Sequence, residues 1–259
     1  MASKVDHHLL ADLQREPCDV VVVAGGDGTV SRAACELCGW DVPLTILPLG
    51  TANNTALSLG LCEPIEQLIG SWSQARLMPF DLVSWDDGSV RQLLSESLGW
   101  GVFPQAIAAA KSRPRQKKGR RRQLERDREL FDAAIHRAEP RPYDIHVDGR
   151  SYSGSYLMVE VVNLPYLGPR LRVSPPSDPG DGLLELVLAE EGDRAALVEL
   201  ARGGSLEEGA LRHVRGRHLQ IRASDGLLHR DGGLTRHPPG TRSFEIRVNE
   251  AAVGYLRPG

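Results

Sequence analysis

Long apolar runs are what this chain of 259 residues most clearly lacks. No eighteen consecutive residues are apolar, which argues against a membrane-spanning helix. No positive segment followed by an apolar stretch opens the chain, which argues against a secretory signal, and the expected compartment is the cytoplasm. Hydrophobic residues still make up 41% of the chain, enough for the cores of one large or two small domains.

Cysteine is also scarce, with four residues at Cys18, Cys35, Cys38 and Cys62. Only Cys35 and Cys38 have the spacing of a redox or zinc-binding pair, and a zinc ribbon needs a second pair. The pair falls inside a helix expected after Thr29, and not at the helix start, where a thiol pKa would be lowered. We therefore expect inert thiols and no metal or redox centre.

A glycine-rich turn follows the first strongly β-like segment. Residues 19–24, Asp-Val-Val-Val-Val-Ala, are typical of a strand buried in a parallel sheet, and residues 25–29, Gly-Gly-Asp-Gly-Thr, come next. Glycines let the backbone approach a ligand, and amides at the start of the following helix bind phosphate oxygens. Because the carboxylate of Asp27 would repel phosphate, a divalent metal such as Mg²⁺ is expected between them.

A second turn repeats this arrangement. The short apolar segment 43–48 is followed by residues 50–54, Gly-Thr-Ala-Asn-Asn, whose asparagines are capable helix caps for a helix expected over 55–61. Two strand–turn–helix units in succession bring both turns to one edge of a sheet, where open α/β folds bind ligands. The pair predicts a nucleotide-phosphate site; the alternative is that the first turn is only a tight turn.

The pattern along the chain predicts two lobes. Residues 1–79 alternate helix, strand and turn, which indicates an α/β nucleotide-binding lobe with a parallel sheet. Residues 80–239 are rich in short strands and indicate a mostly antiparallel β-sandwich, with residues from about 240 to 259 able to return to the first lobe. Strands are expected over 92–97, 143–147, 155–162, 183–189, 218–223 and 243–248, and helices over 120–138 and 194–202.

The strongest charge feature is residues 111–122, with eight cations in twelve positions and no acid. Such density attracts polyanions, and each cation near an anionic membrane contributes about 1 kcal/mol. A peripheral position at the inner membrane face is one expectation, and a mobile solvated loop is the equal alternative. Nucleic acid is disfavoured because few aromatics accompany the cations and no nucleic-acid motif is present.

Together the two turns resemble the catalytic domain shared by diacylglycerol, sphingosine and related bacterial lipid kinases, distantly akin to NAD kinases. In that family the Gly-Gly-Asp-Gly-Thr turn binds nucleotide phosphates, and a Pro-x-Gly-Thr-x-Asn turn lies beside it. Residues 80–82, Phe-Asp-Leu, resemble a strand whose aspartate helps to hold the catalytic metal. Residues 163–171 and 175–184 resemble the second-domain signature, whose last loop holds a structural cation.

The resemblance implies a kinase that binds ATP and Mg²⁺ between its lobes and phosphorylates a hydroxyl of diacylglycerol or a related lipid held by the second lobe. It also implies which residues form the site. The implied nucleotide-binding residues are Gly25, Gly26, Asp27, Gly28, Thr29, Gly50, Thr51 and Asn53. The implied metal ligands are Asp27 and Asp81 for the catalytic Mg²⁺, and the side chain of Asp181 with the backbone carbonyls of Asp178 and Leu183 for the structural cation.

Three features depart from the family pattern. Relatives carry Asp-Gly-Glu near the C-terminus with the glutamate as general base; this chain has Gly233 in its place, which leaves Asp231 beside Asp27 as the candidate catalytic residues. Asn54 stands where many relatives have aspartate. Only 24 residues precede Gly25, where relatives have a longer lead with an Asn-Pro-x-Ser-Gly turn, so we expect either a shortened sheet or a start further upstream.

These departures keep two alternatives open: a nucleotide-binding pseudokinase without transfer activity, and an NAD-kinase-like enzyme. An uncovered sheet edge would also favour the pairing of two copies. Two other carboxylates are weighed as substitutes for the missing glutamate, Glu96 before a glycine-rich turn and Glu160 in the apolar run 157–162. We expect a turn-facing Glu96 and an edge-facing Glu160 without a catalytic role.

Overall fold

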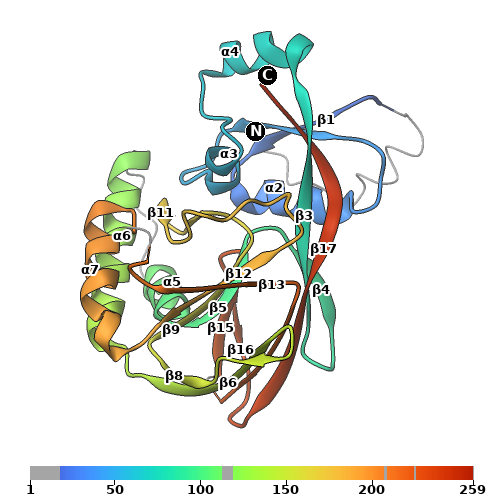
Figure 1. Cartoon of the computed structure of the whole chain (residues 1–259). Coiled ribbons are helices and arrows are strands. Elements are labelled where there is room, and N and C mark those ends of the chain that lie inside the picture. Colours follow the sequence, from blue (N-terminus) through green and yellow to red (C-terminus); the bar gives the residue numbers. More distant parts are fainter. Residues whose placement is uncertain (1–17, 113–118, 207–208, 225, 259) are drawn as a thin grey trace.

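The computed structural model describes residues 18–112, 119–206, 209–224 and 226–258. They form a mixed α/β structure with an amino-terminal region and an antiparallel second lobe, which confirms the predicted fold class. Two long antiparallel strands, β3 (Arg76–Asp86) and β17 (Arg242–Arg257), run side by side through both regions in Figure 1. The regions therefore share a continuous sheet.

The amino-terminal region consists of two strand–turn–helix units. β1 (Val21–Gly25) pairs in parallel with β2 (Leu44–Pro48), and a buried apolar cluster that includes Val30 and Ile46 joins the helices to these strands. Among the described residues β1 pairs only with β2, so it is the edge of the described sheet. The helices of this region are α2 (Asp27–Glu36), α3 (Asn54–Ser58), α4 (Ile65–Ser71) and the short 3-10 helix η1 (Trp72–Gln74).

The larger sheet has the order β1-β2-β17-β14-β6-β7, with β3, β4 and β8 paired outside this path. β17 runs parallel to β2 and antiparallel to β14 and β3. Its register along β3 shifts between Asn249 and Val253, where Ala251 has a φ of 45°, so the strand bulges. The other strands are β4 (Arg91–Leu94), β6 (Arg141–Val147), β7 (Arg150–Ser151), β8 (Gly154–Tyr156) and β14 (His218–Ala223).

The second sheet is antiparallel and has the order β13-β12-β9-β5-β15-β16. Its inner face packs on the larger sheet around Trp100 and Phe244, whose ring centroids are 5.1 Å apart. The strands are β5 (Ser97–Gly101), β9 (Met158–Val162), β12 (Leu184–Ala189), β13 (Arg212–Gly216), β15 (Leu227–Arg230) and β16 (Gly233–Arg236), and a separate hairpin joins β10 (Tyr166–Leu167) to β11 (Leu171–Arg172).

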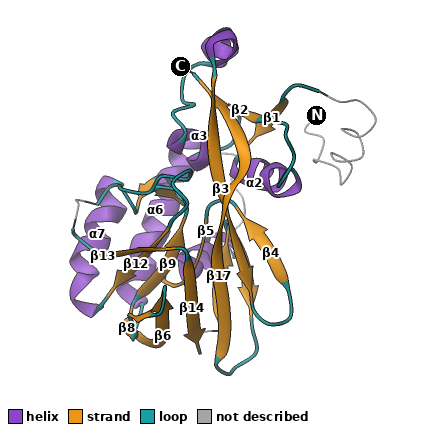
Figure 2. Ribbon diagram, turned by 45° about the vertical axis from the view of Figure 1, so that its right-hand side comes forward, coloured by secondary structure: helices purple, strands orange, loops and turns teal. Residues whose placement is uncertain are grey.

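Three helices cover the outer face of the second sheet (Figure 2). Phe103, Phe131 and Leu197 are buried in the apolar cluster between these helices and Met158 of β9. The helices are α5 (Val102–Lys111), α6 (Arg120–Arg137) and α7 (Arg194–Gly203), with the 3-10 helix η2 (Glu191–Asp193) before α7.

The expected elements are largely present, with three corrections. The strand expected over 155–162 is two strands, β8 and β9, separated at Leu157. The helices expected over 120–138 and 194–202 are α6 and α7. The strand expected over 92–97 is two strands, β4 and β5. The amides of Ser95, Glu96 and Ser97 donate to the carboxylate of Asp231, which interrupts the strand between them. The helix expected over 55–61 ends at Ser58. The expected division at 79/80 falls inside β3, and both that division and the pairing of two copies stay predictions.

Candidate functional site

The two glycine-rich turns are in direct contact. The amides of Leu49 and Gly50 donate to the carbonyl of Gly25 at 2.9 and 3.2 Å. A Cβ on Gly50 would overlap the Cα of Gly26, so neither turn could approach the other with a larger residue there. The residues predicted from sequence as one site are thus adjacent at the ends of β1 and β2.

The carboxylate of Asp27 bridges the first turn to the second. Its Oδ1 accepts a hydrogen bond from the amide of Thr55 at 3.2 Å, at the start of α3. Burial raises the pKa of Asp27, and the backbone amides of Thr55, Asn53 and Asn54 oppose that rise. Asp27 is therefore a partly buried carboxylate held by backbone donors.

The two asparagines hold the second turn in shape. Asn53 has a φ of 55°, and its side-chain amide donates to the carbonyls of Pro48 and Gly50 at 3.0 and 3.2 Å. Asn54, where many members of the resembled family carry aspartate, donates to the carbonyl of Gly168 at 3.0 Å. Asn54 thus connects the turn to the second lobe.

A cleft of about 960 Å³ opens in front of these turns. One wall is polar and belongs to the turns, with Asp27 and Thr51 among its residues. The opposite wall belongs to α5, whose lining residues other than Lys111 are apolar, and to α6, which adds Phe131 and three polar side chains. Gly232 contributes the backbone between the two. The lining residues from α5 and α6 are Phe103, Ala106, Ile107, Ala110, Lys111, Gln123, Arg126, Asp127 and Phe131.

Two arginines of the second lobe also hold the second turn. Arg120, at the start of α6, donates to the carbonyl of Leu49 at 2.9 Å, and Arg170 donates to the carbonyl of Ala52 at 2.7 Å. Because two carbonyls three residues apart are held from another lobe, the position of the turn depends on the position of α6 and the 166–172 hairpin. Sequence reasoning missed these contacts, because one sequence does not show which side chains meet across lobes.

Asp231 lies behind the cleft and not in its lining. Its two carboxylate oxygens accept from the amides of Ser95, Glu96 and Ser97 at 2.9 to 3.0 Å and from the hydroxyl of Ser31 at 2.5 Å. With four donors on it, the carboxylate fastens the β4–β5 loop to α2. Its predicted role as a base stays a prediction, and Gly233 lies in β16.

Glu96 is buried, at 6% exposure, beside these groups. The hydroxyl of Thr55 donates to its Oε1 at 3.3 Å, and its own amide donates to Asp231. The turn-facing Glu96 expected from sequence is wrong, because its side chain is buried against Thr55 of α3. Burial raises the pKa of Glu96 well above its usual value, and the nearby charges of Asp27 and Asp231 add to that rise.

Glu96→Gln should raise the free energy of unfolding at neutral pH. A carboxyl that stays protonated when folded but ionises when unfolded makes stability fall as pH rises above its ordinary pKa of 4.5, by at most about 1.4 kcal/mol per pH unit. The gain from glutamine should therefore grow from pH 5 to pH 8 in urea titrations. Glu199→Gln, at an exposed ion pair on α7, should show no such trend, and a pH-independent gain for Glu96→Gln would contradict the assignment.

Asp81 is a structural hub in the described structure. Its Oδ1 and Oδ2 accept from the amides of Ala251 and Gly182, each at 2.7 Å, and burial raises its pKa. The carboxylate therefore joins the bulge of β17 to the loop before β12. Asp81 is 1% exposed and does not line the cleft, and its predicted role as a metal ligand stays a prediction.

The loop with the implied structural-cation ligands is held by protein donors. Asp178 accepts from the amide of Gly180 at 3.1 Å, and Asp181 accepts from the amide of Leu183 at 3.0 Å and pairs with the guanidinium of Arg215. Within the described ranges, no group of three or more histidine, cysteine or acidic side chains could hold a metal ion. The cation site thus stays a prediction, and Arg215 is the cationic partner of Asp181.

All four cysteines are free, and Cys35 lies in α2. Burial raises the pKa of Cys35 to about 12, so this thiol is not a ready nucleophile.

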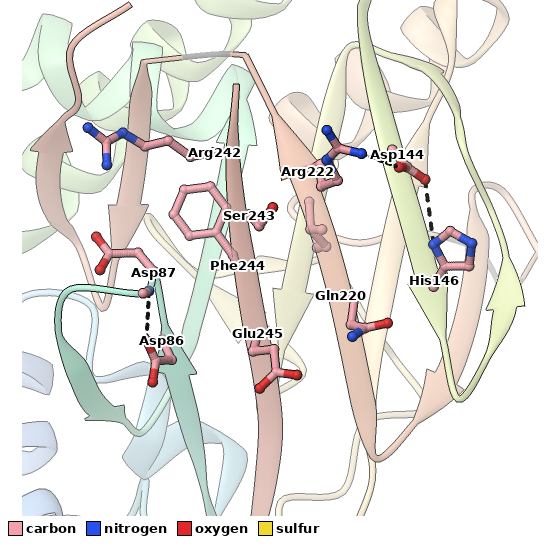
Figure 3. Close-up of a pocket in the computed structure, with 12 residues that line it drawn as sticks. Asp86, Asp87, Asp144, His146, Gln220, Arg222, Arg242, Ser243, Phe244 and Glu245 are labelled. Carbon is pink, nitrogen blue, oxygen red and sulfur yellow. Dashed lines mark hydrogen bonds and ion pairs between the residues drawn. The ribbon is translucent and has the colours of Figure 1, made fainter. Parts of the chain in front are cut away.

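A second hollow of about 640 Å³ lies over the polar face of the larger sheet (Figure 3). Figure 3 shows Asp144 beside His146, 3.5 Å apart, with Arg222 and Glu245 on neighbouring strands. Its charges are of both signs, and none of the residues predicted for the site lines it. The cleft beside Asp27 is therefore the candidate site.

Family models match most of the chain. Residues 2–85 match the diacylglycerol kinase catalytic domain, and residues 120–251 match the YegS C-terminal NAD kinase beta sandwich-like domain. No helix of the described ranges is long and apolar enough to cross a membrane.

Individual relatives are similar over nearly the whole chain. A diacylglycerol kinase of Mycobacterium tuberculosis is 27% identical over 262 residues, which cover 97% of this chain and 81% of the relative. A diacylglycerol kinase of Bacillus subtilis is 22% identical over 231 residues, or 86% and 73% of the two chains. The crystal structure of a diacylglycerol kinase from Bacillus anthracis superposes with a TM-score of 0.72 at 20% identity, covers 98% and 83% of the two chains, and shows the same fold.

Proposed function

Because this chain belongs to the family of diacylglycerol kinase and YegS-type lipid kinases, we propose that it transfers the γ-phosphoryl group of ATP, with Mg²⁺, to a hydroxyl of diacylglycerol or a related lipid. One observation carries the proposal: a single cleft has the two glycine-rich turns on one wall and the apolar side chains of α5, with Phe131 of α6, on the other. Phosphoryl transfer between a nucleotide and a lipid needs both surfaces within reach of one reacting group.

The polar wall supplies what nucleotide phosphates require. The first residues of α2, Asp27 to Thr29, line the cleft, and this helix of ten residues adds the positive end of its dipole there. Three cations, Arg32, Lys111 and Arg126, line the same cleft from α2, α5 and α6. We assign the phosphates to residues 25–29 and 50–53, with these cations balancing their charge.

Mg²⁺ fits Asp27 better than it fits Asp81. Asp27 offers hard carboxylate oxygen at the cleft wall, whereas both oxygens of Asp81 are already bound by amides. When bound, Mg²⁺ would neutralise charge that develops on the transferred phosphoryl group. We therefore assign the carboxylate contact with Mg²⁺ to Asp27, through a water molecule of the metal's shell, which leaves the carboxylate able to accept a proton.

The reaction also needs a group that accepts the proton of the lipid hydroxyl. Asp27 lines the cleft, whereas Asp231 lies behind it with four donors on its carboxylate. Burial raises the pKa of Asp27, which makes its carboxylate a stronger proton acceptor than an exposed aspartate. We assign proton acceptance to Asp27, with Asp231 holding the loop that carries Glu96.

The acceptor lipid would lie along the apolar wall. The small side chains of Ala106 and Ala110 line the cleft from α5, and Phe131 lines it from α6. Burial of acyl chains against such a surface is favourable, in proportion to the apolar area removed from water.

The proposal is tested by incubating the full chain with ATP labelled on the γ-phosphate, Mg²⁺ and mixed micelles that contain diacylglycerol. Label in the lipid phase supports it. Binding of ATP without transfer would favour the pseudokinase, and transfer to NAD would favour the NAD-kinase-like alternative. Absence of ATP binding would defeat all three.

We also propose that α6 attaches the protein to an anionic membrane beside the cleft. Arg120, Arg121 and Arg122 occupy the first turn of α6, and no acidic residue lies in that turn. Lys111 and Arg126 line the adjacent cleft mouth. Cations at a helix start are disfavoured by its dipole, so an anionic surface would relieve a local cost. The remaining cations of the stretch, at 113–118, lie outside the described residues.

Changing Arg121 and Arg122 to glutamine should weaken binding to vesicles with phosphatidylglycerol by about 30-fold, because two cations contribute about 2 kcal/mol. Cosedimentation measures this, and binding to phosphatidylcholine vesicles should not change. The matched double change of Arg150 and Arg236, exposed on strands, should have little effect. Equal losses for both double variants would show a general charge effect and contradict an attachment through α6.

A further inference from the structure

A buried acid–histidine pair lies in the second sheet and has no part in the proposed transfer. Glu160 of β9 and His229 of β15 are 0% and 3% exposed, and Nε2 of the histidine is 2.6 Å from Oε1 of the glutamate. β9 is an interior strand of its sheet, so the edge-facing Glu160 expected from sequence is wrong. A charged or polar pair is costly to bury here unless every polar atom has a partner.

Gly99 makes the pair possible. In the register of the sheet Gly99 of β5 lies between Glu160 and His229, opposite both. A Cβ at Gly99 would overlap the carboxylate of Glu160. The two side chains thus meet across an intervening strand because that strand has no side chain at this point.

The pair leaves two buried polar atoms without a partner, Oε2 of Glu160 and Nδ1 of His229. A carboxylate oxygen accepts hydrogen bonds, and Nδ1 is an acceptor when the ring is neutral with its proton on Nε2. When the ring is charged, Nδ1 donates instead. In either state Oε2 needs a donor, and a hydroxyl or amino group of a ligand can supply it.

One aromatic ring separates this pair from the cleft. The ring of Phe103 is 5.7 Å from that of His229 and 4.7 Å from that of Phe131, and both phenylalanines line the cleft. Phe103 is the second residue of α5, two positions after Gly101, whose φ is 84°. The polar Glu160–His229 pair therefore lies next to the apolar wall assigned to the acceptor lipid.

We infer that Glu160 and His229 form a specificity subsite for a hydrogen-bond donor of the acceptor lipid, a hydroxyl or amino group other than the one that is phosphorylated. This inference rests on the proposed function and narrows the acceptor to lipids that carry a second hydrogen-bond donor. A rotation of the Phe103 side chain would open the way to the pair. Lipids with a second hydrogen-bond donor are then preferred over lipids in which that donor is blocked. A blocked lipid leaves the buried carboxylate oxygen of Glu160 without a partner, which penalises its binding.

The test compares 1-O-oleylglycerol with its 2-O-methyl ether, in which a methyl group replaces the proton of the second hydroxyl. The unchanged chain should favour the free hydroxyl by about 10-fold or more in kcat/KM. Glu160→Leu with His229→Phe should reduce that ratio to about 1. Should the double variant not fold, Glu160→Gln keeps the size of the side chain and should lower the ratio by several-fold. Glu185→Gln, at a buried carboxylate with partners in Ser177 and Arg215, is the control and should keep the ratio.

Binding without ATP separates this inference from the proposed function. Thermal shifts of the full chain in micelles of each lipid should be larger with the free hydroxyl, and the difference should vanish in the variants. If no lipid is phosphorylated but this difference and its loss are seen, the subsite stands and the kinase proposal fails. If lipids are phosphorylated but the ratio is near 1, or is unchanged by the variants, the pair is only structural and the inference is overturned.

Discussion

Asp27→Asn should lower phosphoryl transfer to lipid by about 10³-fold, because the change removes both the carboxylate at the cleft wall and the proposed proton acceptor. The asparagine Oδ1 can still accept the hydrogen bond from Thr55, so the fold should persist. Thermal unfolding and a transfer assay with labelled ATP measure the two effects on the same preparation.

Asp132→Asn is the matched control for this prediction. Asp132 lies on α6 beside His136, outside the cleft lining, and its change should alter transfer by less than about 2-fold. A variant at Asp27 that keeps more than a tenth of the transfer rate would contradict its assignment as proton acceptor. Asp231 would then be the next residue to replace.

Gly50→Ala should separate the two turns and destabilise the amino-terminal region. The added Cβ meets the backbone of Gly26, which cannot rotate away as a side chain could. Overpacking of this kind costs about 3 kcal/mol, or a fall of about 6–12 °C in Tm, and ATP binding should be lost with it. Differential scanning calorimetry and equilibrium ATP binding measure both.

Gly28→Ala provides the matched control in the same motif. A Cβ on Gly28 would meet nothing within 4 Å, and alanine favours a helix more than glycine does. Its Tm should therefore equal or exceed that of the unchanged chain. Equal destabilisation by both alanines would show that the close contact between the turns is not what makes Gly50 necessary.

The local features of the site are largely predictable from sequence. A β-branched strand, two glycines and a helix start define a phosphate-binding turn by backbone chemistry alone, and residues 25–29 show this pattern. The second turn repeats it. The predicted helix over 120–138 has the same basis, because helix signals are local in the chain.

Contacts between distant segments are not predictable in this way. The bulge of β17 at Ala251 is stabilised by Asp81, which lies 170 positions away in the chain. The sequence near either residue does not indicate this contact. Glu160 looked like an edge residue because its partner His229 lies two strands away and depends on the absence of a side chain at Gly99. Burial, and with it the raised pKa of Glu96, follows from such pairings.

The most direct test is a crystal structure of the chain with Mg²⁺ and a non-hydrolysable ATP analogue. We predict that the phosphates contact the turns at 25–29 and 50–53, with the γ-phosphate beside Asp27 and facing the apolar wall of α5 and α6. Phosphates bound elsewhere, or a γ-phosphate that faces away from this wall, would contradict the account of one shared cleft.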